Sequence, residues 1–121
     1  MAKILVADDS PTEARIFELA LMEKGHEVIV AHDGEEGERR ALEENPDLLV
    51  LDIMMPRKNG FQVCRDLKSR PETKHIPIII VTSKGAEADI FWGRKQGADE
   101  YLVKPFKPQV LAETVDRLLA R

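Results

Sequence analysis

The feature that most constrains the fold is the alternation of short apolar runs with longer amphipathic stretches. Three of these runs, residues 4–6, 48–51 and 78–81, are uncharged, continuous and rich in branched side chains. A strand that is apolar at every position is buried on both faces, which is typical of a parallel sheet covered by helices. Shorter runs at residues 28–30 and 101–103 predict two more strands nearer the edges of the sheet.

The segment after the first run carries the signals of a helix start. Ser10 and Glu13 fit a capping box, and Pro11 stands at the first helical position. Gly25 predicts the end of this helix. The spacing of the apolar residues predicts one buried face, made of Ile16, Phe17, Ala20 and Leu21.

Four more helices continue the alternation. Asp33 can cap the second, with Glu36 in its first turn, and Asn45 followed by proline ends it. The others are predicted over residues 61–69, 86–96 and 108–120. The last has an apolar side made of Val110, Leu111, Val115, Leu118 and Leu119. This order predicts an α/β fold, a flavodoxin-like (βα)₅ sandwich whose parallel five-stranded sheet has the order 2-1-3-4-5.

Composition narrows the class of protein. The chain of 121 residues fits one domain, residues 1–121, and its 43% hydrophobic and 33% charged residues are typical of a globular domain with a core. The net charge of −4 argues against nucleic acid or an anionic membrane as partner. No apolar run is long enough to span a bilayer. Cys64 is the only cysteine, so no internal disulfide can form, and we expect a cytoplasmic location.

Polar residues of complementary chemistry follow four of the predicted strands. They are Asp8 and Asp9 after the first strand, Asp52 after the third, Thr82 and Ser83 after the fourth, and Lys104 after the fifth. Ligands of open α/β sheets bind at the carboxyl ends of the strands, where the strand order reverses. We therefore expect three carboxylates, a hydroxyl group and an ammonium group to share one pocket.

Such a pocket suits phosphoryl transfer. Clustered carboxylates repel one another, and a hard cation such as Mg²⁺ removes the conflict. A carboxylate can act as nucleophile towards phosphorus, while a metal, a lysine and a hydroxyl neutralise the equatorial oxygens. Each residue alone has a simpler interpretation, as a helix cap, a turn residue or a solvated lysine. Their joint occurrence at four strand ends favours the shared site.

Four sequence motifs carry a resemblance to a known family. They span residues 4–10, residues 52–56 with Asn59 and Gly60, residues 80–83, and residues 97–105. With these motifs the chain resembles the receiver domain of two-component response regulators over essentially its whole length. The resemblance implies a phosphoacceptor signalling protein, not an enzyme acting on a separate substrate. Its phosphorylation and dephosphorylation would be self-catalysed.

The resemblance also implies roles for individual residues in the pocket. It makes Asp52 the phosphoacceptor and a metal ligand, and Asp9 a direct Mg²⁺ ligand. It makes Asp8 an acidic partner that acts mostly through water, and the backbone carbonyl of Met54 a further ligand.

The remaining implied roles concern the phosphoryl oxygens and the signal. Thr82 and Lys104 would bind the phosphoryl oxygens, and a cis peptide bond before Pro105 would turn Lys104 towards the pocket. Tyr101 stands where the family has a switch aromatic that rotates inward after phosphorylation. The signal would then appear on the face formed by residues 86–96, residues 101–103 and the last helix, with Ile90 or Trp92 beside Tyr101.

The implied partners are proteins. A histidine kinase or a phosphotransfer protein would donate the phosphoryl group, and a downstream protein would bind the switching face. We expect a monomer or a weak dimer, with neither nucleic acid nor membrane as partner. A narrower resemblance, to single-domain regulators of twitching-motility, chemotaxis-like pathways, rests on residues 9–13 and 91–98.

Other classes of protein fit less well. A flavodoxin-like electron carrier needs a phosphate-cradling loop after the first strand, where Asp8 and Asp9 would repel phosphate. A hydrolase with an aspartyl-phosphate intermediate needs a substrate cap, and the chain has no spare length for one. A degenerate receiver that serves only as a scaffold would lack the full set of polar residues. The sequence leaves open whether this receiver was excised from a longer protein with an output module.

Overall fold

The computed structural model describes residues 1–121 and has five strands and five helices in strict alternation. The strands are β1 (Lys3–Ala7), β2 (Glu27–Ala31), β3 (Leu48–Asp52), β4 (Ile78–Thr82) and β5 (Glu100–Val103). The helices are α1 (Pro11–Glu23), α2 (Gly34–Glu44), α3 (Gly60–Lys68), α4 (Glu87–Lys95) and α5 (Pro108–Leu119). All strand pairs are parallel and the order is β2-β1-β3-β4-β5. The predicted flavodoxin-like sandwich is confirmed.

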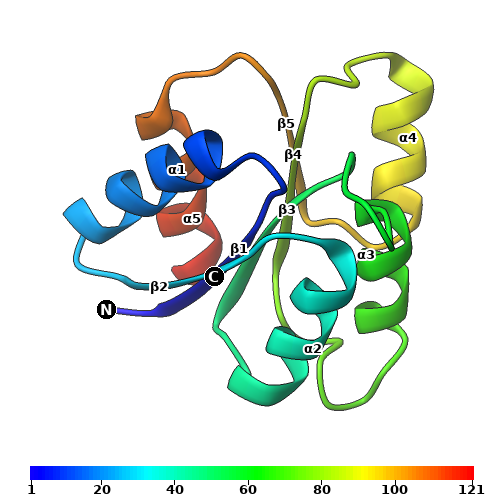
Figure 1. Cartoon of the computed structure of the whole chain (residues 1–121), viewed down its shortest axis with the longest axis horizontal. Helices are drawn as coiled ribbons and strands as arrows, with labels where there is room; N and C mark the ends of the chain where they lie inside the picture. The colour runs from blue at the N-terminus through cyan, green and yellow to red at the C-terminus, as the bar shows by residue number, and fades with distance from the viewer.

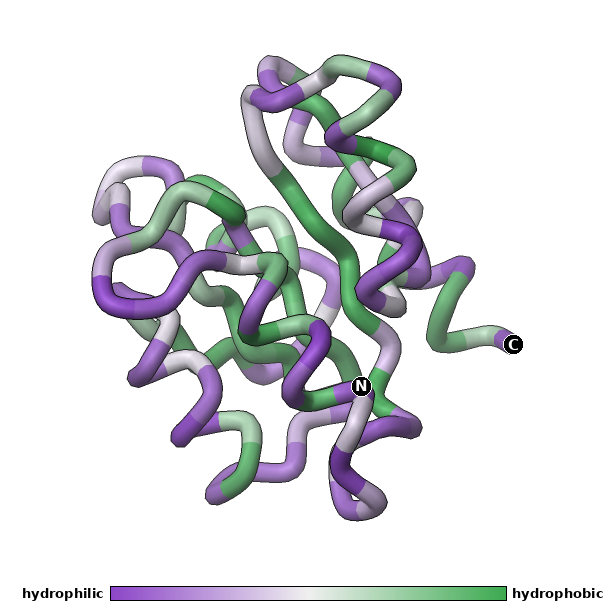
Figure 2. Tube along the Cα trace, turned by 90° about the vertical axis from the view of Figure 1, so that its right-hand side faces the viewer, coloured by the Kyte–Doolittle hydropathy of each residue, from purple (hydrophilic) through white to green (hydrophobic).

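Helices cover both faces of the sheet. Helices α1 and α5 lie together on one side, and α2, α3 and α4 lie on the other (Figure 1). The central strands β1, β3 and β4 are almost completely buried, because each of their faces meets a helical layer. The hydropathy colouring shows the same arrangement, with apolar strands inside and polar loops outside (Figure 2). No helix combines the length and the apolar composition that a membrane crossing requires.

The hydrophobic core consists of two clusters, one on each face of the sheet. Alternate residues of one strand enter different clusters, so Leu49 packs towards α2 and α3 while Val50 packs towards α1 and α5. This division is why the buried strands have no polar alternation in the sequence.

Local sequence signals account for the helix starts. The side chains of Ser10, Asp33 and Asn59 each accept a hydrogen bond from a backbone N–H in the first turn of α1, α2 and α3. Asn45, in the left-handed region with φ of 46°, ends α2. The predicted helix bounds are correct to within one or two residues.

One predicted helix face is partly wrong. Phe17 and Leu21 are buried, but Ile16 is exposed and Ala20 is only half-buried. Ala14 takes the place that Ile16 was expected to occupy. Helix α1 is therefore oriented so that Ala14 faces the sheet and Ile16 faces solvent.

Candidate functional site

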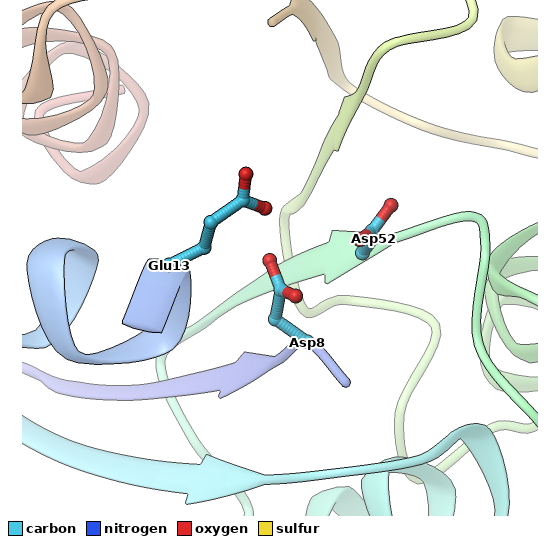
Figure 3. Close-up of side chains that lie close together, drawn as sticks. All are labelled: Asp8, Glu13 and Asp52. Atoms are coloured by element: carbon cyan, nitrogen blue, oxygen red, sulfur yellow. The ribbon is translucent and has the colours of Figure 1, made fainter. Parts of the chain in front are cut away.

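Three carboxylates converge at the carboxyl edge of the sheet. Asp8 follows β1, Asp52 ends β3, and Glu13 reaches in from the first turn of α1 (Figure 3). One carboxylate oxygen from each residue lies within 4.8 Å of the other two. Strands β1 and β3 are neighbours in the sheet, which is why side chains separated by 44 positions in sequence meet here.

Asp8 is the most deeply buried acid of the pocket, with no exposed surface. Burial is the main reason why its pKa is raised from 3.8 to about 6; the nearby charges of Asp52 and Glu13 also raise it. The N–H of Ser10, which donates to Asp8 Oδ1 at 2.9 Å, and the charge of Lys104 oppose this rise. The ionised form of Asp8 is therefore disfavoured, because its buried carboxylate is not solvated by water.

Asp52 lies at the bottom of the pocket and is 5% exposed. Burial raises its pKa, and Lys104 and the N–H of Met54 oppose that rise. The Met54 N–H donates to Asp52 Oδ1 at 3.3 Å, and Lys104 Nζ donates to Oδ2 at 3.3 Å. Gly60 packs against this turn so closely that a Cβ atom there would lie 2.3 Å from the Asp52 carbonyl oxygen.

Lys104 is the only cation among these carboxylates. Its Nζ donates to Asp8 Oδ2 and Asp52 Oδ2, each at 3.3 Å, and to Glu13 Oε1. Burial alone would lower the pKa of Lys104, but the hydrogen bond to Glu13 and the charges of Asp52 and Asp8 outweigh burial and raise it. The ammonium group is therefore charged. The peptide bond between Lys104 and Pro105 is cis, as predicted.

Glu13 is the residue of this group that the sequence interpretation missed. Only one of the two hydrogen bonds of the expected capping box forms: Ser10 Oγ accepts from the N–H of Glu13 at 3.3 Å. The reciprocal bond is absent, since the N–H of Ser10 donates to Asp8 instead. The Glu13 carboxylate is thus free to reach Lys104.

Asp9 and Met54 lie at the rim of the site. Together with Glu13, Asp52 and Lys104 they line an open pocket of about 460 Å³. Asp9 is exposed and lies outside the close group of carboxylates. The sequence had predicted that Asp8, Asp9 and Asp52 would form this group, but Glu13 takes the place of Asp9. The Asp9 side chain faces the same opening as Asp52.

Thr82 and Tyr101 flank the pocket on the side of α4. Thr82 is fully buried, and its Oγ1 accepts from the N–H of Lys84 at 3.2 Å. The Tyr101 hydroxyl donates to the carbonyl oxygen of Lys84 at 2.6 Å. Tyr101 is only 8% exposed and points inward in this structure. The rotation of its ring on phosphorylation stays a prediction.

A larger hollow lies away from this pocket. It measures about 730 Å³ and is lined over α2 by alternating acids and arginines such as Glu36, Arg39, Arg57 and Arg70. These groups pair with one another across the surface, for example Arg57 with Asp33. The hollow contains no convergent catalytic set, and the strand-end pocket is the better candidate in spite of its smaller volume.

The donor set of the strand-end pocket fits a hard divalent cation. Asp8, Asp52 and Glu13 bring three carboxylates together with one ammonium group, so the ionised group has an excess of negative charge. The pKa of Asp8 is raised chiefly by burial and to a lesser degree by the neighbouring carboxylates, and a bound cation would offset both effects. Carboxylate and carbonyl oxygens are ligands that Mg²⁺ prefers. The pocket can therefore hold Mg²⁺ beside the Asp52 carboxylate.

The fold and the acidic pocket together are those of a CheY-like signalling module. Residues 4–116 match the family described as response regulator receiver domain, and the chain belongs to this family. Receiver domains are phosphoacceptor modules of two-component systems, which interact with histidine kinases and with downstream targets.

Individual relatives show how far the likeness extends. The chain is 46% identical over 120 residues to the protein PilH of Pseudomonas aeruginosa, with 99% of each chain covered. It is 40% identical to the phosphate regulon transcriptional regulatory protein PhoB of Rhizobium meliloti, but spans only 53% of that protein. The chemotaxis response regulator CheY4 of Vibrio cholerae has a similar solved structure, with a TM-score of 0.91, 32% identity and 98% of both chains covered.

Proposed function

We propose that residues 1–121 act as one receiver domain that accepts a phosphoryl group on Asp52 in a Mg²⁺-dependent reaction. The observation that carries the proposal is the position of Lys104 Nζ, 3.3 Å from both Asp52 and Asp8 at the end of the central strand. This contact places a charged donor beside the one carboxylate that ends β3 and opens to the pocket.

The proposed chemistry uses a phosphohistidine of a kinase or a phosphotransfer protein. A carboxylate oxygen of Asp52 attacks phosphorus and the phosphorus–nitrogen bond breaks. The departing imidazole nitrogen keeps the electron pair and takes a proton. Lys104 and the Thr82 hydroxyl bind the phosphoryl oxygens and orient the group. Hydrolysis of the acyl phosphate in the same pocket returns Asp52 to its carboxylate form.

Bound Mg²⁺ would neutralise charge on the phosphoryl oxygens. Asp8 and Asp52 would hold it, with Asp9 and the carbonyl oxygen of Met54 at the rim of the pocket. Asp8 would act mostly through water, as the family resemblance implies. Asp9 is exposed beside the opening, and its side chain has to turn towards the metal to become a ligand.

The proposed output surface is the α4–β5–α5 face. Phe91 and Trp92 are large exposed side chains on α4, and Val103 on β5 is exposed as well. Apolar and aromatic side chains that stay in solvent mark protein-binding surfaces. Ile90 packs against the core and would contribute less than Trp92. We propose that a downstream protein binds this face and that the chain is a monomer or a weak dimer.

The test is phosphorylation by acetyl phosphate. With Mg²⁺, intact mass spectrometry should show the addition of one phosphoryl group, and Asp52→Asn should abolish it. Asp47→Asn is the matched control, because Asp47 precedes the same strand at its opposite end. A normal mass shift in Asp52→Asn would overturn the assignment, and so would a loss of phosphorylation in Asp47→Asn alone.

A further inference from the structure

Glu13 occupies the pocket without belonging to the set of strand-end residues. Its backbone is fixed in the first turn of α1 by the Ser10 cap, while its side chain crosses to Lys104. The Glu13 side chain is 42% exposed, whereas those of Asp8 and Asp52 are 0% and 8% exposed. Lys104 thus joins two buried acids to one that is solvated.

The donors of Lys104 are fully engaged in this arrangement. An ammonium group has three N–H donors, and Lys104 makes three carboxylate contacts, to Asp8, Asp52 and Glu13. A phosphoryl group on Asp52 adds negative charge and strong acceptor oxygens. Lys104 can bind these oxygens only if one of its present partners gives up a donor.

Glu13 is the partner that can be released at the lowest cost. Asp8 is fully buried, so losing its counter-charge would leave a desolvated carboxylate. Glu13 is partly solvated, and water can replace Lys104 at its carboxylate. Breaking its ion pair with Lys104 therefore costs little, as is usual for pairs with a solvated partner.

We propose that Glu13 is a positioning residue that holds Lys104 in the unphosphorylated pocket and competes with the phosphoryl group for it. The inference rests on the proposed function, since it concerns how strongly the pocket holds a phosphoryl group on Asp52. Glu13 opposes the phosphorylated state, while Lys104 supports it. The balance between them sets how much phosphorylated protein forms at a given supply of donor.

The test measures the binding of beryllofluoride, a phosphoryl mimic that does not hydrolyse, at saturating Mg²⁺. Glu13→Gln removes the competing charge, so the affinity for beryllofluoride should rise by about threefold, within the range of an exposed ion pair. Glu18→Gln is the matched control, because Glu18 is on the same helix, loses the same charge, and pairs with Arg15 away from the pocket. That control should change the affinity little.

A spectroscopic measurement separates positioning from a general structural effect. In the wild-type protein, the side-chain carboxyl carbon of Glu13 should shift in the NMR spectrum when beryllofluoride binds and Lys104 leaves. The carboxyl carbon of Glu18 should not shift. The affinity for Mg²⁺ alone, measured separately, should fall by less than about tenfold in Glu13→Gln, the lower end of what loss of a metal ligand's partner produces.

The outcomes distinguish the two proposals. If the wild-type protein binds no beryllofluoride with Mg²⁺, the proposed function fails. If the wild-type protein binds it but Glu13→Gln binds it equally or more weakly, only the inference about Glu13 is overturned. A loss of Mg²⁺ affinity beyond about tenfold would place Glu13 with the metal and overturn the inference as well.

Discussion

The hydroxyl of Tyr101 donates a 2.6 Å hydrogen bond to the backbone carbonyl of Lys84, and this bond closes the β4–α4 loop over the tyrosine ring. Gly93 of α4 makes the inward position of the ring possible. A Cβ atom at Gly93 would lie 2.8 Å from Tyr101 Cε2 and 2.9 Å from Cδ2. The ring could not stay where it is beside a side chain at this position.

We therefore expect Gly93→Ala to expose Tyr101 and to lower the free energy of unfolding by up to about 2 kcal/mol. Alanine gains about 1 kcal/mol of helix propensity, but crowding of a packed ring costs about 1–3 kcal/mol. Urea unfolding gives the stability. In a Tyr101→Ala background the crowding is gone, so the same Gly93→Ala change should stabilise the protein. Equal effects in both backgrounds would contradict the ring contact.

A second prediction concerns Asp99, which joins the start of β4 to α3 at the opposite end of the sheet. Asp99 Oδ2 accepts from the N–H of Ile78 at 2.8 Å and from Lys68 Nζ at 3.0 Å. Burial alone would raise the pKa of Asp99, but these contacts outweigh burial and lower it. A lowered pKa in the folded state means that ionised Asp99 stabilises the fold above the ordinary carboxyl pKa. This stabilisation is lost as the pH falls through the pKa of the folded state.

Asp99→Asn should therefore lower the free energy of unfolding by about 1–3 kcal/mol at pH 7, as expected for a lost charge-assisted hydrogen bond. The difference from wild type should shrink below about pH 4. Urea titrations across this range measure it, with Glu43→Gln as a control, because Glu43 only pairs with the exposed Arg39. A stability difference that stays constant down to acidic pH would exclude the ionic contribution.

A third prediction uses the raised pKa of Asp8. Its folded value of about 6 lies above the ordinary 3.8, so the folded state holds the proton more tightly than the unfolded state. Stability therefore falls as the pH rises through this window and stays lower above it. In EDTA at pH 7, Asp8→Asn should raise the free energy of unfolding by up to about 3 kcal/mol. That gain should disappear below about pH 4.

Magnesium should remove most of the stability difference between wild type and Asp8→Asn. Wild type should gain stability with Mg²⁺, by about 2.7 kcal/mol at a concentration one hundred times the Kd, because the metal binds only the folded state. Asp8→Asn should lose most of that gain, whereas Asp47→Asn should keep it. Thermal melting with and without Mg²⁺ measures both effects. Identical melting of wild type in the two conditions would rule out the metal site.

The strand-end residues were predictable because topology decides where they lie. A continuous apolar strand must be buried on both faces, so parallel strands with helical crossovers bring Asp8, Asp52 and Lys104 to one edge. The positions of these side chains follow from the path of the backbone alone. The cis bond before Pro105, by contrast, was expected from the family resemblance.

Glu13 and Ile16 were not predictable in the same way, because each depends on a choice between local alternatives. The capping box and the turn at Asp8 compete for the single N–H of Ser10, and Asp8 wins. Asp8 stands two residues before the cap Ser10, and this spacing is typical of such a turn. It was the one indication that the Glu13 side chain would not bond to the N–H of Ser10. The rotation of α1 that exposes Ile16 is set by the packing of Ala14 and Phe17, which periodicity alone does not resolve.

The last prediction concerns how the pocket reports to the α4–β5–α5 face. Lys84 connects the two sides, because its N–H donates to Thr82 Oγ1 at 3.2 Å and its carbonyl oxygen accepts from Tyr101. A phosphoryl group that draws the Thr82 hydroxyl towards Asp52 should therefore move the backbone of Lys84. From the inward position that Tyr101 has in this structure, we expect the loop to tighten around the ring.

Beryllofluoride with Mg²⁺ should therefore shift backbone amide resonances outside the pocket mainly in the β4–α4 loop, in α4 and at Tyr101. Tyr101→Phe keeps the ring but removes the hydroxyl bond to Lys84, so the shifts in α4 should shrink while those at Asp52 persist. The two spectra together test the path, since the variant leaves the pocket residues unchanged. Shifts concentrated on α1 and α2, or equal shifts of α4 in both proteins, would show that the signal leaves the pocket without passing through Lys84 and Tyr101.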